Sequence, residues 1–367
     1  MVKQKSFDLF GKEITRKYKL RHEFIFPPFS VLNTREGIWQ RRKREWISLG
    51  IKGELGRANN VLDMSATVAG ITNQDERNKW NAERRESPKH RKQKLTPATA
   101  TRCWLGGKET PSSKKFRKFG VTGGSALPGM QYSKTGERDS VGTSIFDPVL
   151  CELAYRWFCP AKGKILDPFA GGSTRGVVAS VLGYDYTGIE IRKEQIKANE
   201  EQAEKIKVNP KWILGDSYKI NKLLPKKEKY DLIFTSPPYY DLEVYSEMKN
   251  DGSAKQTYQE FIKWYEQLFT KTIKFLNQNR FLVVQVGEIR DKKGVYQNFV
   301  GDTITCFKNM GLYYYNEIIL VTSVGSLPIR AGRIFRSSRK IGKTHQNILV
   351  FYKGDLSKIK KVFRDKK

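Results

Sequence analysis

The sequence has few cysteines and histidines, and their spacing does not suit a metal site. Its 367 residues include four cysteines and three histidines. No two cysteines form a CxxC pair and the histidines lie far apart, so we expect no zinc or other metal site. Four dispersed thiols are most simply explained as buried, reduced side chains.

The sequence also lacks any apolar run near the roughly 20 residues that a membrane-spanning helix needs. Its first residues, MVKQKSFDLFGKEITRKYKL, have no apolar centre of the kind found in a signal peptide. We therefore expect a cytoplasmic protein that does not enter a membrane.

Acidic residues are scarce relative to basic ones. Asp and Glu number 38 against 68 Lys and Arg, which gives a formal net charge of +30. Such a field attracts a polyanion such as DNA or RNA, and it would also attract an anionic membrane surface. Hydrophobic residues make up 38% of the chain, enough to build a folded core.

The chain divides by composition into three regions. Residues 1–144 form a basic N-terminal region, loop-rich between Arg77 and Lys118, that could contact DNA or recognise a target sequence. Residues 145–354 alternate short apolar strands with amphipathic helices, and residues 355–367 form a basic tail. The alternation predicts an α/β fold with a mostly parallel sheet covered by helices on both faces. Strands are expected at 164–170, 184–191, 211–216, 230–236, 280–289, 313–322 and 346–354, the last two forming an antiparallel hairpin.

Neither GxxxxGK[ST] nor GxGxxG occurs, so a phosphate-binding loop of those types is excluded. Instead, DPFAGGSTRG (167–176) places a Gly-rich turn between a strand and a helix, where the backbone can approach a ligand closely. The next two strands end at Glu190, which could accept from ribose hydroxyls, and Asp216, which could accept from an exocyclic amine. These three strand ends favour a nucleoside ligand without phosphates. The alternatives are an empty tight turn and acids that only cap helices.

The stretch FTSPPYY (234–240) follows the apolar run YDLIF. Two consecutive prolines cannot donate to a sheet ladder, so the strand ends there and the backbone carbonyls are held rigidly. The alternative interpretation is a rigid turn with an aromatic ring packed on proline.

DPFAGGS, the acidic ends of the next two strands and then FTSPPY resemble the amino-group DNA methyltransferases that use S-adenosylmethionine. The resemblance covers residues 145–354, and FDPVLCELAYRWFCPAKGK (146–164) resembles the helix that completes the methionine pocket in this family. It implies a class I, Rossmann-like fold of seven strands with a terminal antiparallel hairpin. The whole chain also looks like the DNA modification methylases carried by bacteriophages and prophages, which implies a bacterial or phage-infected cell.

The resemblance implies S-adenosylmethionine as cofactor and double-stranded DNA as partner. The cofactor-binding residues it implies are Asp167, Pro168, Phe169, Ala170, Gly171, Gly172, Glu190 and Asp216. The catalytic residues it implies are Ser236, Pro237, Pro238 and Tyr239. The oxygen of Ser236 and the carbonyl of Pro237 would accept hydrogen bonds from the amine of a flipped base, and Tyr239 would stack on that base.

A hydrophobic residue followed by TSPPY is typical of cytosine N4 enzymes, which we favour over adenine N6 enzymes. Cytosine C5 chemistry needs a Pro-Cys dipeptide on this loop, whereas Cys159-Pro160 has the reverse order and lies upstream. An RNA amino-methyltransferase and a catalytically inert nucleic-acid-binding module remain as alternatives.

The segment SVGSLPIRAGRIFRSSRKIGKTH (323–345) carries no acid. It could grip DNA phosphates or read guanine edges, and its alternative interpretation is a solvated basic hairpin. Its candidate nucleic-acid-binding residues are Arg330, Arg333, Arg336, Arg339 and Lys340.

Overall fold

The computed structural model describes residues 19–51, 146–240, 257–291, 293–325 and 327–363. The chain separates into two compact units, of which the first comprises residues 1–61 and 144–367 and the second comprises residues 62–143. The basic stretch between Arg77 and Lys118 and the last four residues of the tail lie outside the described part. The boundary at residue 144 and the role of the N-terminal region therefore stay predictions.

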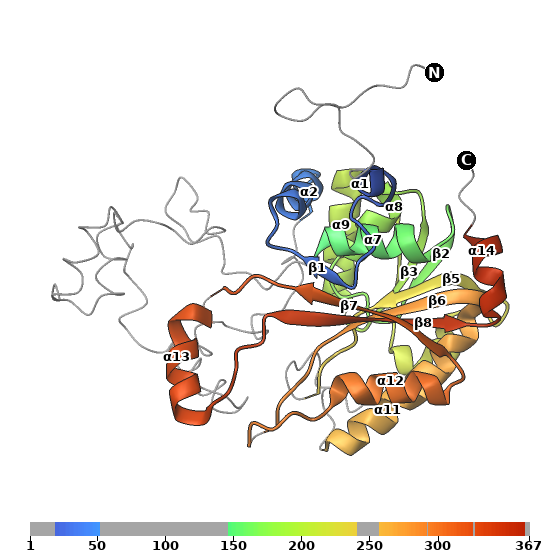
Figure 1. Cartoon of the computed structure of the whole chain (residues 1–367). Helices are drawn as coiled ribbons and strands as arrows, with labels where there is room; N and C mark the ends of the chain where they lie inside the picture. Colours follow the sequence, from blue (N-terminus) through green and yellow to red (C-terminus); the bar gives the residue numbers. More distant parts are fainter. Residues whose placement is uncertain (1–18, 52–145, 241–256, 292, 326, 364–367) are drawn as a thin grey trace, which may run out of the picture. The chain divides into compact units, whose positions relative to one another are not determined.

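The first unit is built on an eight-stranded sheet with the order β1-β7-β8-β6-β5-β2-β3-β4 (Figure 1). The strands are β1 (Val31–Asn33), β2 (Lys164–Asp167), β3 (Asp185–Glu190), β4 (Lys211–Leu214), β5 (Tyr230–Thr235), β6 (Leu276–Val286), β7 (Tyr313–Val321) and β8 (His345–Lys353).

Strands β2 to β6 pair in parallel, and β8 runs antiparallel to both β6 and β7. The mostly parallel α/β fold with a terminal antiparallel hairpin is confirmed. Strand β2 pairs with β3 on one side and β5 on the other, so the chain reverses its direction of travel across the sheet there. Open α/β sheets bind ligands at the carboxyl ends of the strands beside such a reversal.

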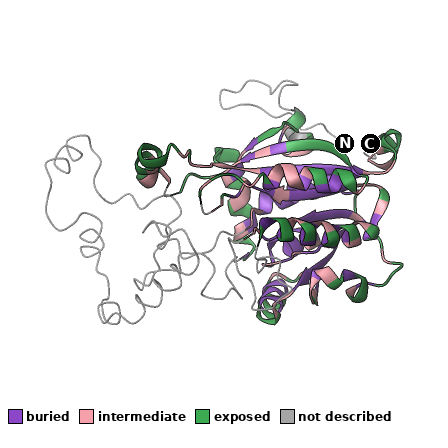
Figure 2. Ribbon diagram, turned by 90° about the horizontal axis from the view of Figure 1, so that it is seen from below, coloured by how far each residue is buried: buried purple, intermediate pink, exposed green. Residues whose placement is uncertain are grey.

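Helices cover both faces of this sheet, and the buried side chains are concentrated in the strands and on the inner sides of the helices (Figure 2). Two hydrophobic clusters, one on each face, form the core. The first face is covered by α1 (Lys19–Phe24), α2 (Gly37–Ser48), α7 (Pro148–Phe158), α8 (Thr174–Val181) and α9 (Lys193–Ile206). The second face is covered by α10 (Ile220–Leu223), α11 (Tyr258–Thr272) and α12 (Phe299–Asn309).

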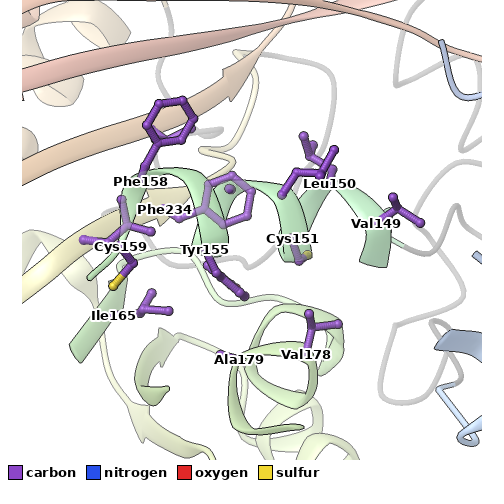
Figure 3. Packing of buried hydrophobic residues seen from close by; sticks show 14 of the residues in the cluster. Val149, Leu150, Cys151, Tyr155, Phe158, Cys159, Ile165, Val178, Ala179 and Phe234 are labelled. Atoms are coloured by element: carbon purple, nitrogen blue, oxygen red, sulfur yellow. The ribbon is translucent and has the colours of Figure 1, made fainter. Parts of the chain in front are cut away.

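Helix α7 shows why the sequence folds this way locally. It begins where the Asp147 side chain accepts from the backbone N–H of Val149, and Pro148 occupies the first turn, where its missing N–H costs nothing. Its aromatic and aliphatic side chains pack between Val178 on α8 and Phe234 on β5 (Figure 3). The helix therefore lies over the strands that carry the candidate site.

The N-terminal residues contribute a strand that the sequence analysis did not predict. Strand β1 pairs in parallel with β7, where Val31 lies opposite Ile319. Trp39 and Trp46 of α2 are buried in the first cluster. This part of the basic N-terminal region thus belongs to the same compact unit as the rest of the sheet.

The segment between β7 and β8 differs from the predicted hairpin loop, because it contains a helix, α13 (Leu327–Ser338). Pro328 lies in its first turn, where proline is tolerated. None of its described residues is buried, and it extends away from the helices that cover the sheet (Figures 1 and 2). Its apolar residues recur at helical spacing, but Pro328 at its start and Gly332 within it are residues that a sequence analysis takes as loop signals. Two short segments, η6 (Leu356–Lys358) and α14 (Ile359–Val362), follow β8.

Candidate active site

The residues singled out from the sequence meet at the carboxyl ends of β2, β3, β4 and β5. Asp167 ends β2 and Glu190 ends β3, while Asp216 follows β4 and Ser236 follows β5. Because these strands are parallel neighbours, their ends form one edge of the sheet.

Asp167 organises this edge from inside the protein. Its side chain is fully buried and accepts four hydrogen bonds, from the Phe169 N–H (3.1 Å), Thr235 Oγ1 (2.7 Å), Arg175 Nε (2.5 Å) and Tyr186 Oη (2.8 Å). These bonds tie the end of β2 to β3, β5 and the start of α8. Asp167 thereby fixes the path of the turn that follows it.

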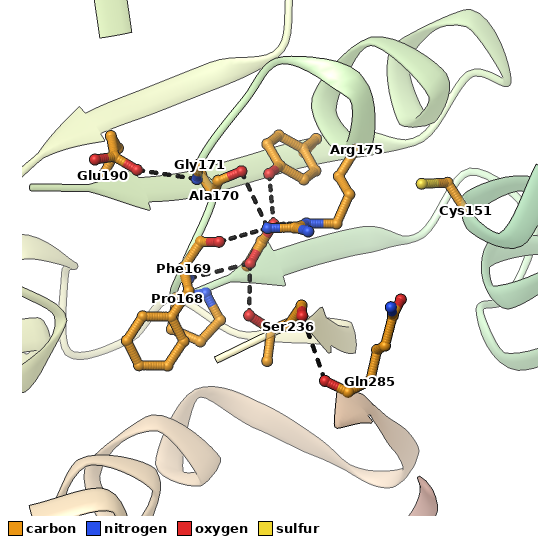
Figure 4. Close-up of polar contacts among 12 residues, drawn as sticks. Cys151, Pro168, Phe169, Ala170, Gly171, Arg175, Glu190, Ser236 and Gln285 are labelled. Atoms are coloured by element: carbon orange, nitrogen blue, oxygen red, sulfur yellow. Dashed lines mark hydrogen bonds and ion pairs between the residues drawn. The ribbon is translucent and has the colours of Figure 1, made fainter. Parts of the chain in front are cut away.

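Arg175 is a site residue that the sequence analysis did not single out. Its guanidinium lies over the turn and donates to the carbonyl oxygens of Phe169 and of Ala170, the latter at 3.0 Å (Figure 4). Burial opposes its charge, but the neighbouring Asp167 carboxylate outweighs burial and raises the pKa of Arg175 above its ordinary value. A cation thus sits beneath the turn permanently. The sequence signal was an arginine at the start of a helix that otherwise reads as apolar.

The Gly-rich turn is held in a conformation that leaves space for a ligand. Gly171 has φ +51°, and a Cβ built there would meet no atom within 4 Å. Its N–H donates to Glu190 Oε2 (2.9 Å) and its carbonyl accepts from Asn199 Nδ2 (2.8 Å). Asn199 in turn accepts from Gln195, and Ser173 donates to Gln202, so buried amides of α9 support the turn. In the sequence, these amide residues recur at helical spacing along α9, which was the available sign that they share one side of the helix.

Glu190 is 8% exposed, and its Oε1 also accepts from the Arg192 N–H (3.0 Å). Burial raises the pKa of this carboxyl, while the two backbone N–H groups and the Arg192 charge oppose the rise. The carboxylate therefore reaches the edge of the turn in a fixed orientation.

Asp216 has one oxygen occupied and one open. Its Oδ1 accepts from the Tyr218 N–H (2.9 Å), which caps the short helix after β4. Its Oδ2 is buried and has no hydrogen-bond partner among the described groups. A buried carboxylate oxygen without a partner is costly, so this atom points to a donor on a ligand.

The SPPY segment begins directly after β5, beside the turn that follows β2. Ser236 Oγ donates to the Gln285 carbonyl on β6 (3.3 Å), which leaves the lone pairs of its oxygen available (Figure 4). Pro237 and Pro238 are buried. Tyr239 Oη donates to Gln346 Oε1 (3.3 Å), and its ring meets Phe299 edge-on at 5.9 Å. Gln346, on β8, is another residue that the sequence analysis missed.

The five basic residues predicted to bind nucleic acid lie on α13 and directly after it. Arg330, Arg333 and Arg336 are helical, Arg339 has φ +55° just beyond the helix end, and Lys340 follows. Strands β7 and β8 thus place these basic residues at the edge of the sheet where β2 to β5 end. The residues lie on α13 and the loop after it, separate from the elements that carry the candidate site (Figure 1).

The acceptors at this edge fit a nucleoside. Glu190 and the open oxygen of Asp216 are acceptors that flank an unobstructed glycine turn, as a ribose and an aromatic amine require. No group of three His, Cys, Asp or Glu side chains suited to a metal ion occurs in the described ranges. No helix in those ranges is both long and apolar enough to cross a bilayer.

A family model described as DNA methylase, N6_N4_Mtase, matches residues 230–367. A search of curated proteins found no significant match. The match begins at β5 and includes the SPPY segment, β6, β7, α13 and β8.

Among solved structures, the chain is similar to TrmN from Thermus thermophilus, with 12% identity and a TM-score of 0.38 over 57% of this chain and 49% of that one. A methyltransferase from Pyrococcus furiosus matches with 15% identity and a TM-score of 0.39, over 67% of this chain and 100% of that one. An S-adenosylmethionine-dependent methyltransferase from Clostridium acetobutylicum matches with 10% identity and a TM-score of 0.35, over 57% and 90%. The chain spans about half the length of TrmN. Residues 230–367 thus match the N6 and N4 family of DNA methylases, and this match implies S-adenosylmethionine as the cofactor.

Proposed function

We propose that this protein transfers a methyl group from S-adenosylmethionine to an exocyclic amino group of a base extruded from double-stranded DNA, with cytosine N4 favoured over adenine N6. The observation that carries the proposal is the position of Ser236 to Tyr239 beside the Gly-rich turn. Thr235, directly before them, is hydrogen-bonded to Asp167 at 2.7 Å. The amine-binding segment and the nucleoside-binding turn are therefore fixed to each other through one buried contact.

The cofactor would lie along the turn formed by Pro168, Phe169, Ala170, Gly171 and Gly172. Glu190 would accept from the ribose hydroxyls and Asp216 Oδ2 would accept from the adenine amine. Asp167 acts through the turn, since its four bonds go to protein groups. When bound, S-adenosylmethionine supplies an electrophilic methyl group, and its sulfur keeps the electron pair when that group is transferred.

Ser236 and Pro237 prepare the amine for attack. The lone pair of an exocyclic amine is delocalised into the ring, and acceptors on its two protons localise that pair on nitrogen. Ser236 Oγ already donates elsewhere, so it can only accept from the amine. The Pro237 carbonyl is fixed by the second proline, Pro238, which limits reorganisation in the transition state.

Tyr239 provides the surface on which the extruded base stacks. Its hydroxyl is anchored on Gln346 and its ring edge on Phe299, which hold the ring plane. Extrusion is required because a paired base does not present its amine for in-line attack. The basic side chains of α13 would hold the flanking phosphates.

The base assignment rests on the FTSPPY pattern, in which a hydrophobic residue precedes TSPPY. Adenine N6 is the alternative because both amines undergo the same chemistry. The cytosine C5 reaction is not supported, since no Pro-Cys dipeptide lies on this loop.

Nucleoside mass spectrometry tests the proposal. Unmethylated DNA incubated with the protein and S-adenosylmethionine should yield N4-methylcytosine, and Ser236→Ala should slow its formation on the order of 100-fold, as the loss of one transition-state hydrogen bond typically does. Cofactor affinity by calorimetry should stay unchanged in this variant, and Ser48→Ala, at the exposed end of α2, is the matched control. N6-methyladenine would assign the alternative base. The proposal would be overturned if several DNAs yielded no methylated nucleoside. This holds whether structured RNA is methylated instead or nothing is methylated.

A further inference from the structure

The loop between α13 and β8 places a lysine against the end of β6. Lys343 Nζ is buried and has no hydrogen-bond partner among the described groups. It lies 3.0 Å from the position that a Cβ would take on Gly287, the first residue after β6. Gly287 is two residues beyond Gln285, whose carbonyl accepts from Ser236. Lys343 therefore belongs to the same edge as the SPPY segment.

Gly287 also locates Lys343 relative to Tyr239. The Cβ position of Gly287 is in close contact with Gln346 Oε1, the atom that accepts from Tyr239 Oη. Any side chain at residue 287 would displace Gln346 or Lys343. The glycine thus keeps open the space in which the ammonium group, Gln346 and the tyrosine hydroxyl meet.

The ammonium group of Lys343 requires a partner that the folded chain does not supply. Burial lowers the pKa of Lys343, and the charge of Glu288 opposes this effect only in part. Glu288 is already engaged, since its oxygens accept from the N–H groups of Phe299 and Val300 at 3.1 Å each. A buried cation without a hydrogen-bonded partner is strongly unfavourable, so an acceptor that arrives with a ligand would relieve it.

We propose that Lys343 binds the extruded base itself and donates to the O2 carbonyl oxygen of cytosine. The inference rests on the proposed function and deepens it by naming the base and the residue that selects it. A base that stacks on Tyr239 enters the space beside Gln346, because the hydroxyl of Tyr239 is bonded to Gln346. The Nζ atom of Lys343 lies in the same space. Adenine carries no oxygen, so it offers this cation a weaker acceptor. Lys343 would thus favour cytosine independently of the TSPPY pattern.

Binding of duplexes that carry one unpaired position tests this without requiring turnover. The wild-type protein should prefer an unpaired cytosine over an unpaired adenine or an abasic site in the same sequence. Lys343→Met keeps the apolar stem and removes the donor, and it should reduce the cytosine preference about 10- to 100-fold, the range for a hydrogen bond to a charged group. Lys343→Arg should restore part of the preference.

Four further measurements separate this role from others. Lys343→Met should lower kcat/KM on cytosine by the same factor, leave cofactor affinity unchanged, and leave the slope of log Kd against log salt for DNA unchanged. Its melting temperature should not fall, because the variant removes an unpaired buried charge. Lys360→Met, an exposed lysine on α14 at the opposite end of β8, is the matched control.

A salt slope smaller by about one would show a phosphate contact and overturn the inference. Weaker binding of the cofactor, an unchanged cytosine preference, or N6-methyladenine as the sole product would also overturn it. A wild-type protein that methylates nothing yet prefers unpaired cytosine, and loses that preference in Lys343→Met, would instead contradict the proposed catalytic function and leave the base-binding role standing.

Discussion

At the scale of single residues, the site combines a polar side chain whose hydrogen bonds are all made within the protein with buried polar atoms that have no hydrogen-bond partner there. Asp167 makes four bonds inside the protein, whereas Asp216 Oδ2 and Lys343 Nζ are buried without a partner among the described groups. The saturated residue shapes the turn, and the open atoms mark where ligand donors and acceptors are missing. We therefore assign a structural role to Asp167, whose hydrogen bonds are all made within the protein, and ligand-binding roles to Asp216 and Lys343, whose buried atoms lack a partner.

Asp216→Asn tests the role of the open oxygen. Asn can still accept from the Tyr218 N–H, but an amide NH₂ at the other position would face the amine of the cofactor and donate where an acceptor is needed. We expect cofactor affinity to fall at least about 10-fold, as the loss of a hydrogen bond to a charged group implies. Calorimetric titration with S-adenosylmethionine measures this. Asp185→Asn, at the exposed start of β3, is the control, and equal affinities for both variants would remove Asp216 from the site.

The motif residues could be predicted from the sequence because they lie at strand ends next to recognisable turns. Arg175 could not, because an arginine beside the Gly-rich turn does not reveal that its guanidinium folds back under that turn. Asn199 and Gln346 could not, since they reach the site through packing of elements further along the chain. The sequence also could not show that Asp167 is saturated, because two of its partners, Tyr186 and Thr235, lie on other strands.

At the scale of elements, α2 is attached to α7 through one buried carboxylate. Glu152 has no exposed side-chain surface and accepts from Arg42 (2.6 and 2.8 Å), Trp46 Nε1 (2.8 Å) and Arg156 (3.1 Å). Asp147, the N-cap of α7, also accepts from Trp39 Nε1 (3.2 Å). The N-terminal helix is thus bonded to the helix that covers the site.

Glu152→Gln should lower the free energy of unfolding by about 2 kcal/mol, because hydrogen bonds to a charged group weaken and the partly buried Arg42 guanidinium loses its counter-charge. Urea unfolding measures this, with Glu45→Gln, an exposed partner of the same Arg42, as the control. Equal stability of the two variants would contradict the docking role of Glu152.

The pH dependence of this difference has a definite sign. Burial by itself would raise the pKa of Glu152, but hydrogen bonds from Arg42 and Trp46 outweigh it and hold the pKa below the ordinary 4.5. A carboxyl with a lowered folded-state pKa stabilises fully above its unfolded pKa, and this contribution is lost as the pH falls through the lowered value. The gap between wild type and Glu152→Gln should therefore narrow below about pH 4.5. A gap that stays constant down to acid unfolding would contradict this pairing.

The core strands and their order of appearance were predictable, since each is a short apolar run between turn signals. Strand β1 was not, because three residues carry too little periodicity to be recognised. Helix α13 was not predicted for a different reason, because Pro328 and Gly332 are taken as loop signals although its apolar residues recur at helical spacing.

At the scale of the whole molecule, the net charge of +30 gives a general attraction for DNA, and α13 concentrates part of it beside the candidate site. Exposed apolar side chains lie among its arginines, with Ile329 63% and Phe335 45% exposed. An exposed helix that carries both arginines and apolar side chains can bind in a DNA groove and contact the phosphates beside it.

Arg336→Ala should weaken DNA binding and reduce the slope of log Kd against log salt by about one, the value for a single phosphate contact. Fluorescence anisotropy over a range of salt concentrations measures this. Arg44→Ala, an exposed arginine on α2, controls for the general loss of charge. Equal slopes for the two variants would show that α13 makes no phosphate contact through Arg336.

Because β1 pairs with β7, residues before and after the basic stretch 52–145 belong to the same sheet unit. Ile51, buried in the first cluster, and Phe146, packed against that cluster, both belong to the sheet unit. Residues 52–145 are thus an insertion into one domain, tethered at both ends, rather than an appendage that precedes it. Trimming the chain at residue 144 would uncover the edge of β7 and remove Trp39 and Trp46 from the core. A minimal catalytic protein should instead retain residues 19–51 and rejoin them to residue 146 with a short flexible linker.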